Sequence, residues 1–366
     1  MATIEVAIDA RLPLVEDPGS GHNRWHPDIE PVASCAPGDT LVFHTRDAAD
    51  GQVTPDSTAA ELAALDLGRV HPLTGPVLVE GAEPGDLLEL DIEEVVPEAF
   101  AYTAVMPGFG FLRDVFPDPF LVRWRVADGV AVSEDLPGVA VPAEPFLGIV
   151  GVAPDRALLA LARRREEEAL ARGDFLAPPT DAASAVPSGL VGEEGLRTGP
   201  PRENGGNLDV RFIGPGAQVL LPVMVEGALL SVGDAHFAQG DGEVCGLAVE
   251  TRAKVRLRVG LRRGGARRGR ATGPRLQLRR RGDVGDRTYI VTTGLSIAAG
   301  TTSLSENTTV AARNAVLDMI DHLSERGLTG EQAYVLCSAA LELRISQVVD
   351  VPHAVVSALL PLDIFT

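Results

Sequence analysis

Glycine and proline are spread along the whole chain, with 39 glycines and 27 prolines among 366 residues. Both residue types favour turns over long helices, so this distribution predicts many short strands joined by turns. Residues 4–8 and 40–44 alternate apolar and polar side chains, and 75–80 and 86–96 read as two further strands. This spacing favours a β-sandwich-like sheet in a chain that is mainly β with some α.

A few segments carry helical spacing instead of strand alternation. Residues 155–172 and 310–323 place apolar side chains on one face, as expected of amphipathic helices. Thr329-Gly-Glu-Gln332 resembles a capping box and predicts a second C-terminal helix, after which 345–351 and 355–360 are expected to be closing strands. Thr58-Ala-Ala-Glu61 resembles another capping box, which predicts a short helix ending at Gly68.

We find no clean linker, so we treat residues 1–366 as a single unit. Residues 173–202 are rich in Gly, Pro, Ala and Ser, which predicts a long loop that is mobile or draped over a site. Residues 262–281 are rich in arginine and are expected to form an exposed hairpin or loop, or alternatively an anion or partner contact. The approximate sub-regions are an N-terminal β part (1–154), a helix and long loop (155–202), a site-bearing β part (203–300), and C-terminal helices with closing strands (301–366).

The chain has a formal net charge of −19, which disfavours binding to nucleic acid or to an anionic membrane. This charge fits a protein that handles neutral or cationic small molecules, although acidity also simply favours solubility. No apolar run reaches the roughly 18 residues that a membrane helix needs, and no signal-peptide pattern opens the chain. Cys35, Cys245 and Cys337 are sparse and form no paired motif, so we expect a reducing, cytoplasmic location.

The densest group of reactive side chains lies in residues 231–246, where Asp234, His236, Gln239, Asp241 and Glu243 stand among four glycines. Side chains two residues apart on a strand point to the same face, so the first two residues of this group form a pair, as do the last two. Upstream, Asn207 and Asp209 form a third such pair behind a double glycine. Together the three pairs offer oxygen and nitrogen ligands for a divalent metal ion, whereas a single pair would more simply be a turn.

Other polar residues are isolated and leave alternatives open. His71 either fixes a loop or has a role in a site, and Glu80 is either a buried general base or a loop carboxylate. Asp47 and Gln52 are expected to form a turn. The histidines at positions 22 and 26 flank Trp25 and are expected at the surface, or else at a pocket entrance.

Several motifs match a known family. The core ones are Gly205-Gly-Asn-Leu-Asp209, Leu221-Pro-Val223, Gly227-Ala-Leu229 and Gly233-Asp-Ala-His-Phe-Ala-Gln-Gly-Asp-Gly-Glu243. The flanking ones are His71-Pro-Leu-Thr-Gly-Pro-Val77, Val79-Glu-Gly-Ala-Glu-Pro-Gly-Asp86, Phe146-Leu-Gly-Ile-Val-Gly-Val-Ala-Pro154, Leu343-Arg-Ile-Ser-Gln-Val-Val-Asp350 and Leu360-Pro-Leu-Asp-Ile-Phe365. In this order and over essentially its whole length, the chain resembles the acetamidase/formamidase family.

The resemblance implies hydrolysis of short aliphatic amides to ammonia and a carboxylate. It also implies a mainly β fold, a segment-exchanged homo-oligomer and, in some members, a bound divalent metal. Asn204 stands where relatives often carry His, and Glu342 stands where they often carry Asp. The loop at 173–202 and the arginine-rich segment also look longer than in the family's minimal form, which puts the substrate in doubt more than the reaction.

The near-absence of lysine argues against two other amidase mechanisms. A Ser–Ser–Lys amidase and a nitrilase-type enzyme both need a lysine, and Lys254 lies in an alternating Arg/Val strand with no glycine-rich serine loop nearby. Attack by water remains, with a divalent ion, zinc or else calcium, polarising the amide. We expect the following roles: Asp209, Asp234 and His236 as metal ligands, Glu80 or Glu243 as general base, and Asn207 and Gln239 orienting the substrate.

Two alternatives to this function remain open from the sequence. The same oxygen-rich cluster could bind a metal for structure alone in a non-catalytic relative. The chain could also hydrolyse another small C–N compound, such as one resembling guanidine or urea.

Overall fold

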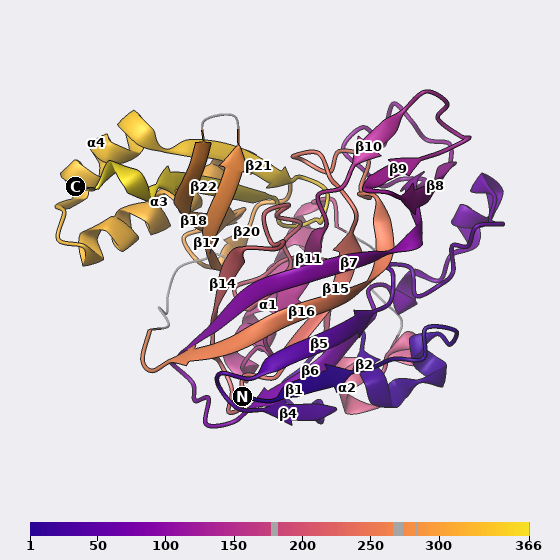
Figure 1. Ribbon diagram of the computed structural model, residues 1–366, viewed down its shortest axis with the longest axis horizontal. Helices are drawn as coiled ribbons and strands as arrows, with labels where there is room; N and C mark the ends of the chain where they lie inside the picture. The colour runs from indigo at the N-terminus through magenta and orange to yellow at the C-terminus, as the bar shows by residue number, and fades with distance from the viewer. Residues whose placement is uncertain (177–181, 266–273, 283–284, 366) are drawn as a thin grey trace.

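The computed structural model describes residues 1–176, 182–265, 274–282 and 285–365, and strands dominate it (Figure 1). One long succession of paired strands forms the outer sheet. Except for the parallel pair that opens it, its neighbours run antiparallel. The order is β1 (Thr3–Val6), β5 (Thr40–Thr45), β16 (Glu250–Arg262), β7 (Leu87–Val105), β14 (Ala217–Pro222), β17 (Arg275–Gly282), β18 (Gly285–Leu295), β22 (Val355–Pro361) and β21 (Glu342–Gln347).

A second group of strands packs against this sheet. Its centre is the antiparallel pair of β11 and β15, flanked by β13 on one side and by β6 on the other, with β2 and β4 pairing to β6. β15 also pairs with the start of β16, so the two groups of strands join at that point. The bounds are β2 (Gly21–His22), β4 (Ala33–Cys35), β6 (Leu73–Val79), β11 (Phe146–Gly151), β13 (Gly205–Asn207) and β15 (Leu230–His236).

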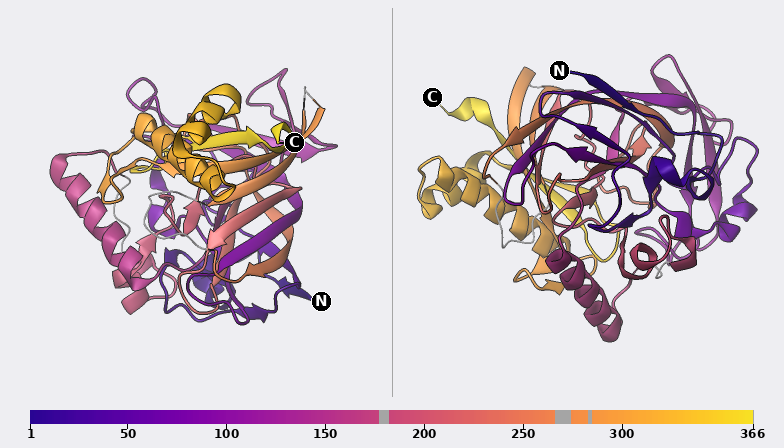
Figure 2. Two further views of the ribbon diagram at one scale, coloured as in Figure 1. Left: turned by 90° about the vertical axis from the view of Figure 1, so that its left-hand side faces the viewer. Right: turned by 90° about the horizontal axis from the view of Figure 1, so that it is seen from below.

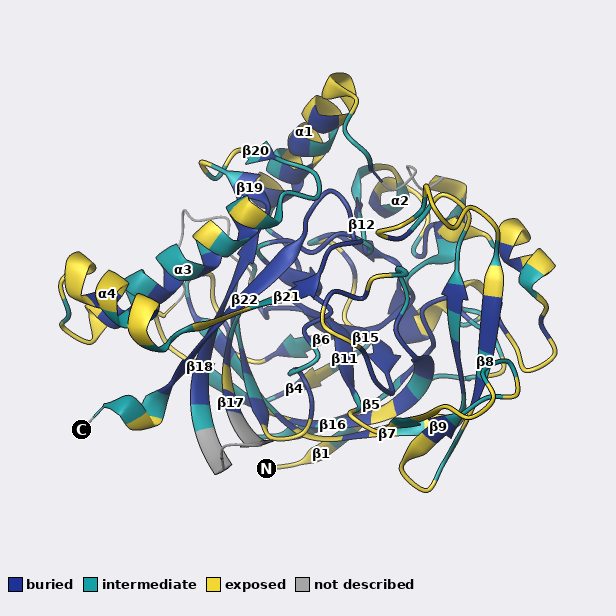
Figure 3. Cartoon of the chain, turned by 90° about the horizontal axis from the view of Figure 1, so that it is seen from above, coloured by how far each residue is buried: buried dark blue, intermediate teal, exposed yellow. Residues whose placement is uncertain are grey.

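The main core lies between these strands and consists largely of valine and leucine. β14 and much of β16 alternate buried and less buried residues, which is the pattern of strands with one face toward a core. β15 is buried along its whole length, so it lies inside the molecule (Figure 3). The fold class predicted from the sequence, mainly β and sandwich-like with some helix, is therefore confirmed.

Helices lie on the outside of the strand layers (Figure 2). α1 (Arg156–Arg172) begins where the Asp155 side chain accepts a hydrogen bond from the Leu158 N–H, and it ends at Gly173 in a left-handed conformation. The two C-terminal helices pack against β18 and β22 through a separate apolar cluster. They are α3 (Thr308–Glu325) and α4 (Gly330–Ala340), and α4 has the predicted capping box.

Two local predictions differ from the structure in detail. The capping box at Thr58 exists, but it opens a 3-10 helix that ends at Ala64, and Gly68 belongs to a second short 3-10 helix, Leu67–Arg69. The region predicted as one loop at 173–202 contains α2 (Leu190–Glu194) and the short strand β12 (Leu196–Arg197), while 177–181 fall outside the described residues.

The arginine-rich segment is partly outside the described residues, at 266–273. Of the rest, Arg262 pairs with Glu89 on β7, and Arg263 pairs with Asp86, the residue before that strand. Short strands β3 (Arg24–Trp25), β8 (Phe120–Ala127), β9 (Val130–Val132), β10 (Ala140–Pro142), β19 (Ile297–Ala298) and β20 (Thr302–Ser303) complete the fold. Among the residues described, no helix is both long and apolar enough to cross a membrane.

Candidate active site

The site lies where the two groups of strands join. His236 ends β15, and its cross-strand partners are Phe146 on β11 and Glu250 at the start of β16. The Phe146 ring contacts the imidazole edge-on, with ring centroids 4.9 Å apart. This register places an imidazole and a carboxylate side by side inside the molecule, and both are buried.

Hydrogen bonds define how the His236 ring is oriented. The Gln239 side-chain N–H donates to the backbone carbonyls of Asp209 and Ser346, so its oxygen is the atom that faces His236 Nδ1 at 3.1 Å. Nδ1 must therefore carry a proton, and Nε2 points the other way. Nε2 lies 3.1 Å from Glu250 Oε2 and 3.4 Å from Asp234 Oδ1.

Three further carboxyl groups lie around His236, Glu250 and Asp234. Asp209 follows β13 and lies 3.9 Å from His236 Nδ1, and Glu243 stands in the turn between β15 and β16. Asp350 comes from the loop after β21, where the buried Gln347 side-chain oxygen accepts the backbone N–H groups of residues 349 and 350. Strands distant in sequence thus bring five acids to one histidine, and all six side chains are buried.

The pKa values of these groups follow from burial and mutual repulsion. Burial raises the pKa of Glu250 to about 8, with His236 partly opposing the shift. Burial and the neighbouring Asp209 raise the pKa of Glu243 and of Asp350 well above the usual range. Burial alone would lower the pKa of His236, but the charges of Glu250 and Asp234 outweigh it and raise the pKa.

Several polar atoms at the centre make no well-aligned hydrogen bond to the described residues, although His236 Nε2 lies within ion-pair distance of Glu250 and Asp234. An unpaired buried polar atom is costly, so a group of them facing one space indicates a ligand or ion. Two sets of side chains have ligand atoms within 4.8 Å of one another: Asp209, His236 and Glu243, and Asp234, His236 and Glu250. The atoms without a well-aligned hydrogen bond are Asn207 Oδ1, Asp209 Oδ1, Asp234 Oδ1, His236 Nε2, Glu250 Oε2 and Asp350 Oδ2.

Local backbone geometry also marks the site. Asp209, Asp234 and Glu243 have φ angles of 46°, 52° and 48°, in the left-handed region that few non-glycine residues adopt. Gly148 on β11 lies directly against the first two of these residues, because a Cβ there would stand 2.5 Å from Asp209 Oδ1 and 2.8 Å from Asp234 Oδ2. The carboxylates can approach this closely only because position 148 has no side chain.

A cavity of about 440 Å³ opens onto these groups. Its polar part is formed by Asn207, Asp234, Glu243, Glu250 and Asp350, with His71 beside them. The remaining lining is mostly apolar. Among the described residues that line it, none is a serine, threonine, cysteine or lysine. The cavity therefore offers acids, an amide, a histidine, a tyrosine and an arginine to a ligand.

The structure brings Asn207, Asp209, Asp234, His236 and Glu243 together, as predicted. It gives two other predicted residues different surroundings. The Gln239 amide is fully used in orienting His236 and does not line the cavity, and Glu80 is exposed at the end of β6, where its N–H donates to the Cys35 carbonyl. Asp241, the remaining acid of the 231–246 group, is exposed and pairs with Arg344 at 3.1 Å.

Three residues of the site were missed. The pairing of Glu250 with His236 depends on strand register, which the spacing in the sequence does not reveal. Asp350 and Gly148 lie inside motifs that carried the family resemblance, and this was the available signal for both.

The isolated polar residues have mixed outcomes. His22 and His26 are buried, not at the surface, and His22 bonds to the Arg24 carbonyl and to Ser231 Oγ. Asp47 forms the expected turn by accepting the N–H groups of residues 49 and 51, and the Gln52 side chain donates to the Ala49 carbonyl of the same turn. Asn204 is buried and donates to the Val152 carbonyl, while Glu342 is exposed.

The described residues thus form a mainly β fold that buries five acids around one histidine, the arrangement of a hydrolase with an acid–base or metal site. Comparisons with known proteins name the family within this class. The sequence model of the acetamidase/formamidase family matches residues 7–366. The chain belongs to this family, and it is an amidohydrolase that acts on linear amide C–N bonds.

Individual relatives agree with this assignment. The chain is 35% identical to a formamidase of Methylophilus methylotrophus, covering 100% of this chain and 94% of the relative. It is 34% identical to an acetamidase of Mycolicibacterium smegmatis, covering 92% and 89%. A solved structure of a gamma lactamase from Delftia acidovorans superposes with a TM-score of 0.72 at 35% identity, covering 100% of this chain and 93% of that one.

Proposed function

We propose that the chain hydrolyses the amide C–N bond of its substrate with the help of a divalent metal ion. One observation carries the proposal: five buried carboxyl groups converge on a single buried histidine, and several of their oxygen atoms make no well-aligned hydrogen bond. Buried like charges repel one another, so such a cluster needs a cation or added protons to be stable. A bound cation would neutralise this repulsion and would also pair with the free ligand atoms. It would supply the charge that polarises an amide carbonyl and acidifies a water molecule.

We assign Asp234, His236 and Glu250 as the ligands of this ion. Because Gln239 holds the proton on Nδ1, the Nε2 atom is the one available as a ligand, and the two carboxylates nearest to it belong to Asp234 and Glu250. Asp209, expected as a ligand from the sequence, lies on the Nδ1 side. An imidazole nitrogen among carboxylates favours zinc over calcium, which prefers oxygen ligands.

The remaining polar groups would handle the proton and the substrate. Glu243 lines the cavity and has a raised pKa, so its carboxyl group is suited to take a proton from the attacking water and give it to the leaving nitrogen. Asn207 also lines the cavity, with an amide group available to hydrogen-bond the substrate. Gln239 is a positioning residue that fixes the His236 ring.

The ligand assignment is tested by metal analysis and ammonia release on purified protein and three variants. We expect Glu250→Gln to lose bound metal and to lower kcat/KM by at least roughly 100-fold, more than the loss of an outer partner. Asp209→Asn should keep the metal while losing activity. Asp241→Asn, which changes an exposed acid of the same segment, is the matched control and should keep both. Full metal and full activity in Glu250→Gln would refute the proposal, whereas metal loss confined to Asp209→Asn would favour the set of Asp209, His236 and Glu243.

A cyclic amide is a second candidate substrate, because the structurally similar protein from Delftia acidovorans is named a gamma lactamase. Hydrolysis of a lactam breaks the same type of bond but releases no ammonia, since the nitrogen stays attached to the acid. Measuring both ammonia release from acetamide and ring opening of γ-butyrolactam separates the two. Ring opening that exceeds ammonia release in kcat/KM would favour the cyclic substrate.

A further inference from the structure

Two chemically different sets of side chains line the cavity. The polar set is the acids, Asn207 and His71 named above, together with Tyr102 and Arg197, and most of the other lining residues are aliphatic or aromatic. The apolar lining includes one group of residues that we call the apolar wall: Val53, Leu62, Leu65, Ala104, Met106 and Phe109. An apolar wall this extensive is unfavourable in contact with water, and an apolar group bound there would remove that contact.

The size of the cavity exceeds what a small amide fills. A water-sized group occupies about 30 Å³, so the four heavy atoms of acetamide take up on the order of 120 Å³. The cavity measures about 440 Å³. Acetamide placed against the acids would therefore leave most of the apolar part empty. An amide of ten heavy atoms would occupy roughly 300 Å³ and still fit.

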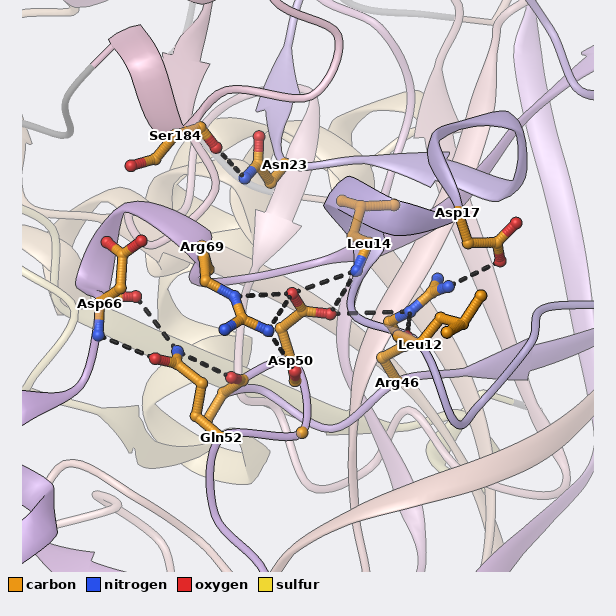
Figure 4. A network of polar contacts seen from close by, with 12 residues as sticks. Leu12, Leu14, Asp17, Asn23, Arg46, Asp50, Gln52, Asp66, Arg69 and Ser184 are labelled. Carbon is orange, nitrogen blue, oxygen red and sulfur yellow. Dashed lines mark hydrogen bonds and ion pairs between the residues drawn. The ribbon is translucent and has the colours of Figure 1, made fainter.

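The apolar wall is anchored on its outer side. Leu62 and Ala104 belong to a packed cluster that includes Tyr102 and Leu121, so the wall has little freedom to collapse into the cavity. The loop that carries residues 48–71 is fixed by the buried Asp50 carboxylate (Figure 4).

Asp50 connects three segments in this network. Its carboxylate accepts the Leu14 N–H at 2.9 Å and the Arg69 Nε–H at 2.9 Å, and it lies 3.6 Å from Arg46 Nε. Ala48, Ala49 and Val70, which line the cavity, are close to these residues in the chain. The space is thus a preformed pocket, held open by packing on one side and by ion pairs on the other.

We propose that the preferred substrates are primary amides whose acyl part is a bulky apolar group of roughly six to eight carbons. This inference rests on the proposed function. The amide nitrogen faces the carboxyl groups, because the leaving nitrogen needs a proton and becomes a cation. The acyl part then lies against the apolar wall. Water adds its oxygen to the carbonyl carbon, the C–N bond breaks, and the nitrogen leaves as ammonia with one proton from water. The resulting acid gives its proton to ammonia.

The test measures ammonia release by the full-length, metal-loaded protein from formamide, acetamide, butanamide, hexanamide and phenylacetamide. We expect kcat/KM to rise along this series by roughly fourfold or more per added methylene, the usual gain for burying one such group. A kcat/KM that is flat or falls from acetamide to phenylacetamide would overturn this inference and leave amide hydrolysis intact. No ammonia from any of these amides would overturn the proposed function as well.

Two variants locate the effect in the apolar wall. Met106→Ala removes part of the wall and should lower the ratio of kcat/KM for phenylacetamide to that for acetamide by roughly tenfold. Val105→Ala is the matched control: Val105 is the neighbouring residue, it does not line the cavity, and the ratio should stay as in the unchanged protein. An unchanged ratio in Met106→Ala, with both variants folded by circular dichroism, would also overturn the inference.

Discussion

Gly148→Ala is the substitution that most directly tests how the site is built. The added Cβ would lie 2.5 Å from Asp209 Oδ1 and 2.8 Å from both Asp234 Oδ2 and the Asp234 carbonyl oxygen. Ordinary contact begins at 3.4 Å, so the Asp209 carboxylate must move by about 0.9 Å. A displacement near 1 Å at a reacting centre costs on the order of 100-fold in rate.

The same substitution also affects stability. Overpacking a tight site costs about 1–3 kcal/mol, and the smaller entropy of an unfolded chain with alanine returns about 0.4–1 kcal/mol. We therefore expect a net loss of about 1–2 kcal/mol in the free energy of unfolding. Because this loss is modest, the variant should fold, and its lower activity can be measured on folded protein.

The assay combines ammonia release with denaturant unfolding of the same preparation. Gly240→Ala is the matched control, since a Cβ there meets nothing within 4 Å and the glycine stands in the segment that carries Glu243. It should change the unfolding free energy by no more than about 0.5 kcal/mol and leave kcat/KM near its original value. Unchanged kcat/KM in Gly148→Ala would refute the argument that the carboxylates depend on the missing side chain.

Three further predictions concern buried charges. Burial alone would raise the pKa of Glu166, but Arg202 and Arg197 outweigh it and lower the pKa from 4.5 to about 2. The ion pairs of Glu166 with these two arginines therefore contribute their full stabilisation above pH 4.5, and about 3 kcal/mol of the unfolding free energy is lost as pH falls to 2. Glu166→Gln should remove this slope in acid-unfolding curves. Burial lowers the pKa of His353 from 6.5 to about 4, so the unfolding free energy should drop by about 3 kcal/mol between these pH values, and unfolding curves of His353→Gln should show a shallower slope there. Asp50→Asn keeps the left-handed backbone but removes the buried charge facing two arginines, and denaturant unfolding should show a loss of at least about 3 kcal/mol.

Much of the fold could be predicted because its signals are local. The alternation in 40–44 and the capping boxes at Thr58 and Thr329 each depend on a few neighbouring residues. The extent of strands was harder to predict. β7 runs from Leu87 to Val105, well beyond the expected end at residue 96, because partners on β16 and β8 continue its pairing. Pairing between distant strands is not visible in either strand alone.

The same distinction between local signals and pairing of distant strands explains which site residues could be predicted. Asp234 and His236 could be found because they share one face of one strand. Glu250 could not, because its position opposite His236 is set by how β15 and β16 pair. Glu80 shows the opposite case: it lies at a strand end inside one of the family motifs, yet it is exposed. The position of a carboxylate in the sequence does not show whether it is buried, and burial is what shifts its pKa.

The backbone of the acids adds an argument for function that the side chains alone do not give. Asp209, Asp234 and Glu243 all adopt left-handed conformations, which cost on the order of 1 kcal/mol or more each for a residue that carries a side chain. Glycine would remove this cost at each position, but it would also remove the carboxylate. The three acids are thus less stable choices than glycine for the backbone, and less stable choices than apolar residues for a buried environment. Two independent costs at the same three positions are best explained by the chemistry that the carboxylates perform.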